Sequence, residues 1–293
     1  MRSFLFVPAD SDKKLTKGQT SGADALILDL EDSVALANKQ VARDNAAQYL
    51  KSADPTGPRI CVRMNALDTP LWKDDLKAII SAEVTPFAIL VPKTISGACI
   101  GRVADHLTNL EASAGIGTDK VKLFCVASET AASLFNLGSY ANVTSRLFAM
   151  TWGAEDLAAD IGARHNKDET GTYTGPYQLA RTLTLLGAVS AGAMPIDGIW
   201  KDFRDDAGLE REARIAARDG FTAKLAIHPA QIETINRVFT PSDEDLAHAR
   251  AIIAAFDAAG DVGVVALNGV MLDIPHLKQA RALIAKTEPA TNN

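Results

Sequence analysis

The sequence predicts an α/β protein, a (β/α)8 TIM barrel with a C-terminal extension. Eight short apolar runs are each followed by a polar turn and, in most cases, by a segment long enough for a helix. The runs are continuously apolar, as expected for strands buried on both faces of a parallel sheet. Eight such units in about 230 residues fit a closed barrel. The alternative is an open Rossmann-like sheet, but its GxGxxG phosphate loop is absent.

The predicted strands follow one another at intervals that leave room for covering helices. In chain order they are SFLFVP (3–8), ALILDLE (25–31), RICVRMN (59–65), FAILVPK (87–93), KLFCVASE (122–129), RLFAMTW (146–152), DGIWKD (197–202) and KLAIHP (224–229). Between them, segments such as 38–52 and 175–192 repeat apolar residues every three or four positions, which predicts amphipathic helices. The glycines of SAGIGTDK precede a strand instead of a helix and are interpreted as a turn.

Residues 1–240 are predicted to form the barrel, and residues 241–293 contain elements that eight units do not need. These are a helical pattern at 245–260, a further strand-like run and an amphipathic helix, with a frayed end at 287–293. We expect this extension to pack on a neighbouring subunit.

Composition excludes several classes of protein. The 293 residues, 47% of them hydrophobic, suffice for one large core. No run of eighteen apolar residues and no signal peptide are present, so a cytoplasmic protein outside the membrane is expected. A net charge of -6 without a dense basic stripe argues against nucleic acid as the main partner. Cys61, Cys99 and Cys125 lack metal-site spacing and are expected to be buried, reduced thiols.

Polar residues gather where the predicted strands end, which is where barrel enzymes place their chemistry. They are Asp29, Glu31, Asp32, Arg63, Asn65, Lys93, Glu129, Glu155, Asp156 and His228. Carboxylates in excess, beside a few cationic side chains, indicate a divalent metal and an anionic substrate. Because oxygen ligands dominate, the metal is expected to be hard.

Mg²⁺ takes one or two carboxylates and fills its other positions with water or substrate oxygens. Glu129 and Asp156, from adjacent strands, suit that role. The alternative is that both only cap the helices that follow, and we interpret Glu155 as such a cap. Asp29, Glu31 and Asp32 are interpreted as a network that orients metal-bound waters, because four carboxylates on one magnesium would be excessive.

Three basic residues also have simpler interpretations. Arg63 is either a functional cation or an internal ion-pair partner of Asp29 or Glu31. Lys93, after Pro92, is either part of the site or a solvated turn residue. For His228 we favour a buried histidine bonded to the backbone.

Taken in order, the motifs resemble the citrate lyase β-subunit-like branch of the HpcH/HpaI aldolase superfamily, which includes citryl-CoA and malyl-CoA lyases. They are RSFLFVPA, GADALILDLEDSVA, VRMNALDTP, LVPK, SETA, WGAEDLAADIG, IDGIWKDFRD, GFTAKLAIHPAQIETIN, FTPS and GVMLDIPHLKQAR. One departure is CVAS before Glu129, where relatives commonly have an aliphatic pair. The resemblance implies a (β/α)8 barrel, Mg²⁺, a CoA-thioester substrate, a 2-oxo acid, and a homotrimer or dimer of trimers.

The resemblance also implies roles for individual residues. Glu129 and Asp156 match the metal-binding carboxylates, and Arg63 matches the arginine that holds the substrate's oxygens. Lys17 lies where relatives place a basic residue toward the CoA phosphates. Asp273 occupies the position of an aspartate that closes over a neighbouring subunit's site and transfers a proton.

The expected function is therefore Mg²⁺-dependent cleavage of a 3-hydroxyacyl-CoA, of citryl-CoA or malyl-CoA type, into an acyl-CoA and a 2-oxo acid. Two alternatives stay open, a malyl-CoA thioesterase and a non-catalytic CoA-ester-binding protein. No motif encodes the choice of acyl group, because that choice rests on pocket shape.

Overall fold

The computed structural model describes residues 1–81 and 85–285, so the predicted frayed end at 287–293 lies outside the described residues. The chain divides into two compact units, Met1–Phe239 and Thr240–Asn293. Within the described residues no helix is both long and apolar enough to cross a membrane.

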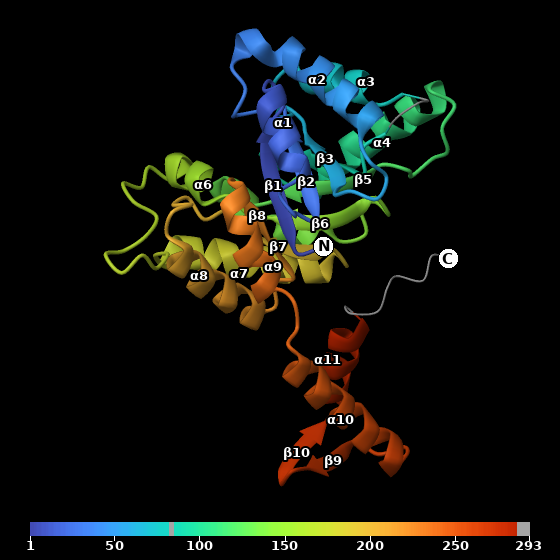
Figure 1. The fold of residues 1–293 in the computed structure, drawn as a ribbon, viewed down its shortest axis with the longest axis vertical. Coiled ribbons are helices and arrows are strands. Elements are labelled where there is room, and N and C mark those ends of the chain that lie inside the picture. The colour runs from blue at the N-terminus through green and yellow to red at the C-terminus, as the bar shows by residue number, and fades with distance from the viewer. Residues whose placement is uncertain (82–84, 286–293) are drawn as a thin grey trace. The chain divides into compact units, whose positions relative to one another are not determined.

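The first unit is a closed barrel of eight parallel strands in the order β1 to β8, with helices around it, which confirms the predicted fold (Figure 1). The strands are β1 Ser3–Pro8, β2 Ala25–Asp29, β3 Arg59–Arg63, β4 Ala88–Val91, β5 Lys122–Val126, β6 Leu147–Thr151, β7 Met194–Asp197 and β8 Ala223–Ala226. The α-helices of this unit are α1 Asp12–Gln19, α2 Lys39–Ser52, α3 Trp72–Ile79, α4 Gly97–Ser113, α5 Ala131–Leu134, α6 Ala154–Asp160, α7 Gly175–Ser190, α8 Asp206–Asp219 and α9 Ile232–Val238.

Alternation along each strand separates two apolar layers. In β2, Leu26 and Leu28 belong to the core between strands and helices, whereas Ile27 packs inside the barrel. Cys61 of β3 also packs inside the barrel. Both layers are closed to solvent, which explains why the strand sequences are apolar throughout.

The seventh strand was predicted wrongly. It spans Met194–Asp197 instead of 197–202, and it contains Pro195, which cannot donate a ladder hydrogen bond. Pro195 still accepts a hydrogen bond from the Thr222 amide through its carbonyl, at 3.0 Å. After Asp197 the chain leaves the sheet at Gly198, where a Cβ would lie 3.1 Å from the Trp152 Nε1 atom.

Several other strands end earlier than predicted, so their last polar residues lie in loops beyond the sheet. Glu31, Lys93 and Glu129 follow β2, β4 and β5 by two or three residues. β8 ends at Ala226, before His228. These loops carry the candidate residues at the carboxyl end of the barrel.

The cysteines only partly match expectation. Cys61 and Cys125 are buried in β3 and β5, but Cys99 in α4 is partly exposed. All three are free thiols, and burial raises the pKa of Cys61 to about 12. Cys61 is therefore unreactive in the folded chain.

The second unit holds α10 Asp243–Ala259, the hairpin β9 Val264–Leu267 and β10 Val270–Asp273, and α11 Ile274–Ala285. The single strand-like run of the prediction is thus two antiparallel strands. Asn268 and Gly269 join them with positive φ at both residues, as a two-residue hairpin turn requires. Ile252, Phe256 and Leu277 are buried in this unit's own core.

Candidate active site at the barrel mouth

Arg63 and Asp29 form the centre of the site because they are register partners at the ends of β3 and β2. Arg63 Nε donates to Asp29 Oδ1 at 2.7 Å, and Nη2 donates to Oδ2 at 2.6 Å. The guanidinium also lies over the Phe6 ring, 4.8 Å from its centroid. The two hydrogen bonds to Asp29 and the contact with the Phe6 ring together fix the orientation of the Arg63 guanidinium plane.

The ion-pair interpretation of Arg63 is confirmed by its contacts with Asp29 and Glu31, and its role as a functional cation stays a prediction. Burial acts to raise the pKa of Asp29, but the Arg63 bond and charge outweigh it and hold that pKa below its ordinary value. Glu31 Oε2 lies 3.0 Å from Arg63 Nη1. The printed hydrogen bonds of Arg63 go to Asp29, through Nε and Nη2, while Nη1 faces Glu31 and, at 3.8 Å, Asp32.

Lys93 ties the loop after β4 to the loop after β2, so it is no solvated turn residue. Its Nζ atom lies 2.7 Å from Glu31 Oε1, 3.0 Å from Asp32 Oδ1 and 3.9 Å from Asp156 Oδ1. Burial opposes the ammonium charge, yet these carboxylates raise the pKa of Lys93.

The Lys93 backbone also binds Glu129. Its φ is +51°, a conformation that is strained for a residue with a Cβ. In this conformation the Lys93 amide donates to Glu129 Oε2 at 2.5 Å. The strained residue thereby fixes the carboxylate of Glu129.

Glu129 is the most unusual carboxylate of the site. It is 3% exposed, although a charged side chain is seldom buried without a counter-charge. Burial, and next the charge of Asp156, raises the pKa of Glu129 to about 8. Gly153, which follows β6, packs on Glu129, so a Cβ at Gly153 would lie 2.8 Å from Glu129 Cγ.

Two cavities meet at Glu129 and Asp156. One, of about 350 Å³, opens over the barrel and includes Arg63 and Trp152 in its lining. The other, of about 640 Å³, includes Lys93, Cys99 and Arg102. The two carboxylates are therefore reachable by a ligand from two sides.

The chemistry of the donors fits a divalent cation. Five carboxylates line the 350 Å³ cavity against one basic side chain, Arg63: those of Asp29, Asp32, Glu129, Glu155 and Asp156. Across residues 1–81 and 85–285 no three His, Cys, Asp or Glu side chains form a metal cluster. Two carboxylates with open space beside them are what Mg²⁺ uses when water and substrate complete its shell.

The remaining candidates have contacts of their own. Glu155 accepts hydrogen bonds from Asn166 and Lys201, at 2.7 and 2.9 Å. His228 is half-buried, not buried, but its Nδ1 does accept from the Ala230 amide at 3.2 Å. Burial, and next the charge of Lys17, lowers the pKa of His228, and Lys17 itself is exposed on α1. Asp273 ends β10 in the second unit.

Sequence reasoning missed residues whose role is to position others. Phe6 stacks on Arg63, and Gly153 leaves room for Glu129. The Trp152 Nε1 atom donates to Asp197 Oδ1 at 2.9 Å, which holds the wall of the 350 Å³ cavity. For Trp152 and Gly153 the sequence did offer a signal, the Trp–Gly pair before Asp156, because a glycine often marks a place where another group packs closely on the backbone.

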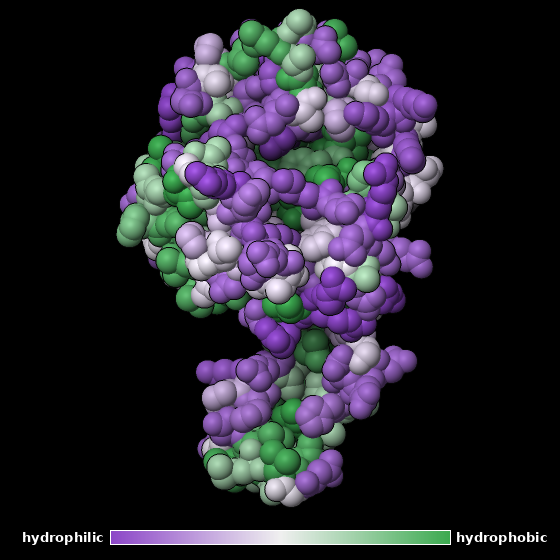
Figure 2. All heavy atoms as spheres, turned by 90° about the vertical axis from the view of Figure 1, so that its left-hand side faces the viewer, coloured by the Kyte–Doolittle hydropathy of each residue, from purple (hydrophilic) through white to green (hydrophobic). Residues whose placement is uncertain are grey.

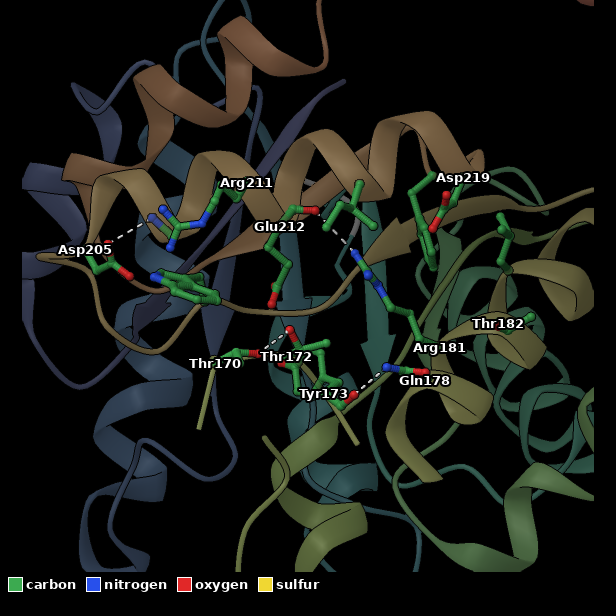
Figure 3. Close-up of a pocket in the computed structure, with 16 residues that line it drawn as sticks. Thr170, Thr172, Tyr173, Gln178, Arg181, Thr182, Asp205, Arg211, Glu212 and Asp219 are labelled. Atoms are coloured by element: carbon green, nitrogen blue, oxygen red, sulfur yellow. Dashed lines mark hydrogen bonds between the residues drawn. The ribbon is translucent and has the colours of Figure 1, made fainter. Parts of the chain in front are cut away.

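Figure 3 shows a separate cavity of about 490 Å³ between α7 and α8. Arg181 points from α7 toward α8, where Nη2 is 3.5 Å from the Glu212 carbonyl. Gln178 Nε2 donates to the Tyr173 carbonyl at 2.6 Å. This cavity contains none of the predicted site residues.

Known proteins match nearly the whole chain. It is 31% identical to citrate lyase subunit beta from Leuconostoc mesenteroides, over 97% of this chain and 92% of that protein. It is 33% identical to an L-malyl-CoA/β-methylmalyl-CoA lyase and 36% identical to a (3S)-malyl-CoA thioesterase, both from Cereibacter sphaeroides, over 98% of this chain and 94% of each relative.

A solved structure of CitE from Mycobacterium tuberculosis, in complex with magnesium, acetoacetate and coenzyme A, superimposes with a TM-score of 0.80. The two chains are 32% identical, and the match covers 97% of each. The family model for HpcH/HpaI aldolase/citrate lyase matches residues 2–229, which span the whole barrel. With its closed barrel and its carboxylate-rich mouth, the chain belongs to the HpcH/HpaI aldolase/citrate lyase family.

Proposed function

We propose that the protein is a Mg²⁺-dependent carbon–carbon lyase. It cleaves a 3-hydroxyacyl-CoA, of citryl-CoA or malyl-CoA type, into an acyl-CoA and a 2-oxo acid. The observation that carries this proposal is buried Glu129 facing Asp156 in a cavity with five carboxylates and one arginine. Such a site favours a divalent cation and, with it, an anionic substrate. Relatives named as citrate lyase subunit beta and malyl-CoA lyase support the reaction class.

Glu129 and Asp156 would hold the magnesium. When bound, the ion supplies Lewis-acid stabilisation to the oxygens of the hydroxy-acid half of the substrate. The Lys93 amide keeps Glu129 in place, and the Lys93 ammonium holds Glu31 and Asp32 beside it.

Arg63 is proposed to stabilise the enolate that forms when the carbon–carbon bond breaks. An N–H of this guanidinium would donate to the thioester oxygen, and Asp29 and Phe6 hold the guanidinium in its orientation. A donor fixed before the reaction needs no reorganisation as charge develops, an effect worth about 3–4 kcal/mol in comparable sites. Lys17 is proposed to contact the CoA phosphates.

Asp273 is proposed to transfer the proton at the acyl-CoA carbon. In the cleavage direction its carboxylic acid gives a proton to the enolate carbon, and in the reverse direction its carboxylate takes one. The second unit would bring Asp273 to the barrel mouth of a neighbouring copy.

The charge balance favours malyl-CoA-type substrates over citryl-CoA. Citryl-CoA carries one more carboxylate, and Arg63 is the one basic residue among the described residues that line the 350 Å³ cavity. Because Arg63 is already paired with Asp29, an extra carboxylate there would be buried without a partner. We expect kcat/KM to be at least about tenfold higher for malyl-CoA.

The test is product analysis by mass spectrometry. A panel of hydroxyacyl-CoA esters is incubated with magnesium and, separately, with chelator. We expect an acyl-CoA and a 2-oxo acid, formed only with the metal. Asp156→Ala should abolish this turnover while circular dichroism stays unchanged, and unaltered activity would disprove the metal assignment.

A second candidate is hydrolysis of the malyl-CoA thioester, favoured by the 36% identity to the thioesterase relative. The same assay separates the two, because free CoA with malate and without glyoxylate would indicate the hydrolase. Tight acetyl-CoA binding without turnover of any ester would instead indicate a binding protein.

A further inference from the structure

One titratable pair stands outside the barrel, at the junction of β10 and α11. His276 Nδ1 lies 2.5 Å from Asp273 Oδ1 and 3.2 Å from the Asp273 amide nitrogen. One ring nitrogen thus contacts both the backbone and the carboxyl group of the same residue. The other carboxyl oxygen, Oδ2, is outside this pair of contacts.

The local sequence holds the two side chains together. Asp273 directly precedes α11, and His276 is the third residue of that helix. This is the spacing of a capping box, in which the third side chain of a helix accepts from the amide before it. Pro275, in the first turn, fixes the backbone between them.

The surroundings of the pair are apolar and exposed. In the hairpin register Val264 lies directly opposite Asp273, and Met271 lies two residues before it on the same face of β10. Val264 is 50% exposed and Met271 is 73% exposed. Figure 2 shows hydrophobic side chains gathered at this end of the C-terminal unit. A carboxyl group in the middle of an exposed apolar face is expected to act on whatever covers that face.

We infer that His276 is the positioning residue of Asp273. The imidazole donates a hydrogen bond from Nδ1–H to Asp273 Oδ1 and leaves Oδ2 for the proton that moves to or from the substrate carbon. When Asp273 gives its Oδ2 proton to the enolate carbon, it becomes a carboxylate whose Oδ1 still accepts from Nδ1–H. When Asp273 takes a proton from the substrate carbon, that proton binds Oδ2, and the same hydrogen bond remains. His276 therefore holds the carboxyl group in one orientation in both protonation states of Asp273 without changing its own.

This inference rests on the proposed role of Asp273, and its test separates the two. The assay follows exchange of acetyl-CoA methyl protons with D₂O by mass spectrometry, alongside lyase kcat and KM. Asp273→Asn should abolish exchange. His276→Ala should lower exchange and kcat by about tenfold, a part of the roughly 10²–10⁴-fold that positioned proton transfer contributes, with KM within about twofold.

Two further variants exclude a purely structural role. His276→Asn, whose short amide can reach Asp273 Oδ1, should restore most of the activity. Asp245→Ala is the matched control, because Asp245 forms a capping box with Ser242 at the start of α10 in the same unit. It should leave exchange unchanged.

Each outcome bears on one claim. If His276→Ala matches the wild type while Asp273→Asn is inactive, the positioning role is wrong and the proton-transfer role stands. If Asp245→Ala lowers exchange as much as His276→Ala, His276 is only a helix cap. Full exchange by Asp273→Asn would overturn the proposed role of Asp273 itself. If His276→Ala does not fold, the comparison of His276→Asn with His276→Gln replaces it, and equal loss in both would contradict the inference.

Discussion

At the scale of single residues, the site depends on carboxylates kept close together, and Glu129 is the clearest case. The pKa of Glu129 is about 8 in the folded chain, against an ordinary value of 4.5 in the unfolded chain. Between these two pH values, the metal-free folded chain keeps a proton on Glu129 that the unfolded chain has lost. As the pH rises from about 4.5 to about 8, this group therefore lowers the stability of the metal-free protein. Above that window its contribution is constant.

The first prediction concerns magnesium affinity and pH. Mg²⁺ binds only ionised Glu129, so binding below pH 8 must release a proton. The Kd for Mg²⁺ should fall by up to about tenfold per pH unit between pH 6 and 8 and level off above. Isothermal titration calorimetry in buffers of different ionisation enthalpy measures both Kd and proton release. Asp156→Asn should move this dependence to lower pH, because the charge that helps to raise the Glu129 pKa is gone while burial, the larger cause, remains. It should also weaken Mg²⁺ binding at every pH, because a proposed ligand is lost. A Kd that does not vary between pH 6 and 8 in the wild type would contradict the assignment.

The second prediction concerns Gly153. An added Cβ would meet Glu129 Cγ at 2.8 Å, closer than packing allows. Gly153→Ala should displace the Glu129 carboxylate and weaken Mg²⁺ binding and kcat/KM by at least about tenfold, at a cost of about 1–3 kcal/mol in stability. Gly175→Ala is the control, because nothing lies within 4 Å of a Cβ at Gly175. Equal Mg²⁺ affinity in both variants would show that Glu129 has room to move.

The residue types of the site were predictable, and an ion pair of Arg63 with Asp29 or Glu31 was one predicted alternative, but its geometry was not predictable. Strand order alone indicates that Asp29, Arg63 and Glu129 lie at one end of the barrel. The bidentate Arg63–Asp29 pair depends on the register of β2 and β3, and the amide bond to Glu129 depends on a positive φ at Lys93. The apolar periodicity of the sequence predicts neither the register of two strands nor a strained backbone conformation.

At the scale of elements, the two errors of prediction have local causes. β7 lies earlier than predicted, at Met194–Asp197, and pairs with both β6 and β8 although Pro195 lacks an amide donor. The predicted single run is the β9–β10 hairpin, whose two strands are separated by Asn268–Gly269, a strong turn signal. Each of these features depends on one residue or one dipeptide, whereas apolar periodicity is read over many residues and does not reveal it.

The end of β7 also carries a buried charge cluster. Asp197 accepts hydrogen bonds from Trp152, Arg181 and Lys224, and Lys224 is fully buried. Burial opposes the Lys224 ammonium, but Asp197 and Glu212 outweigh it and raise the pKa of Lys224. The cluster couples β6, β7, β8 and α7 through charge.

The third prediction follows from that cluster. Lys224→Met leaves Asp197 buried with less counter-charge and should lower the free energy of unfolding by about 3–5 kcal/mol. Arg214→Met removes an exposed i,i+4 pair with Glu210 and should cost less than about 1 kcal/mol. Urea denaturation followed by tryptophan fluorescence measures both. A similar loss of unfolding free energy in the two variants would show that Lys224 contributes no more to stability than an exposed ion pair does.

At the scale of the whole molecule, the chain carries its proposed proton-transfer residue on a different unit from its proposed metal ligands. Asp273 lies in Thr240–Asn293, and Glu129 and Asp156 lie in Met1–Phe239. The two-unit layout agrees with an assembly in which each barrel receives Asp273 from a neighbour, and we expect a homotrimer or a dimer of trimers. Light scattering on the purified protein should give a mass of three or six chains.

The fourth prediction tests whether Asp273 acts between copies. Asp273→Asn and Asp156→Ala chains, each inactive alone, are co-expressed with different tags, and assemblies carrying both tags are purified. If a site combines the barrel of one chain with Asp273 of the next, each trimer that carries both tags regains both residues at about one site in three. Lyase activity should then reach about a third of the wild-type value, or about a quarter if the rings are randomly mixed within hexamers. If Asp273 instead serves its own barrel, every site lacks one residue and the mixed assemblies stay inactive, because neither chain carries both.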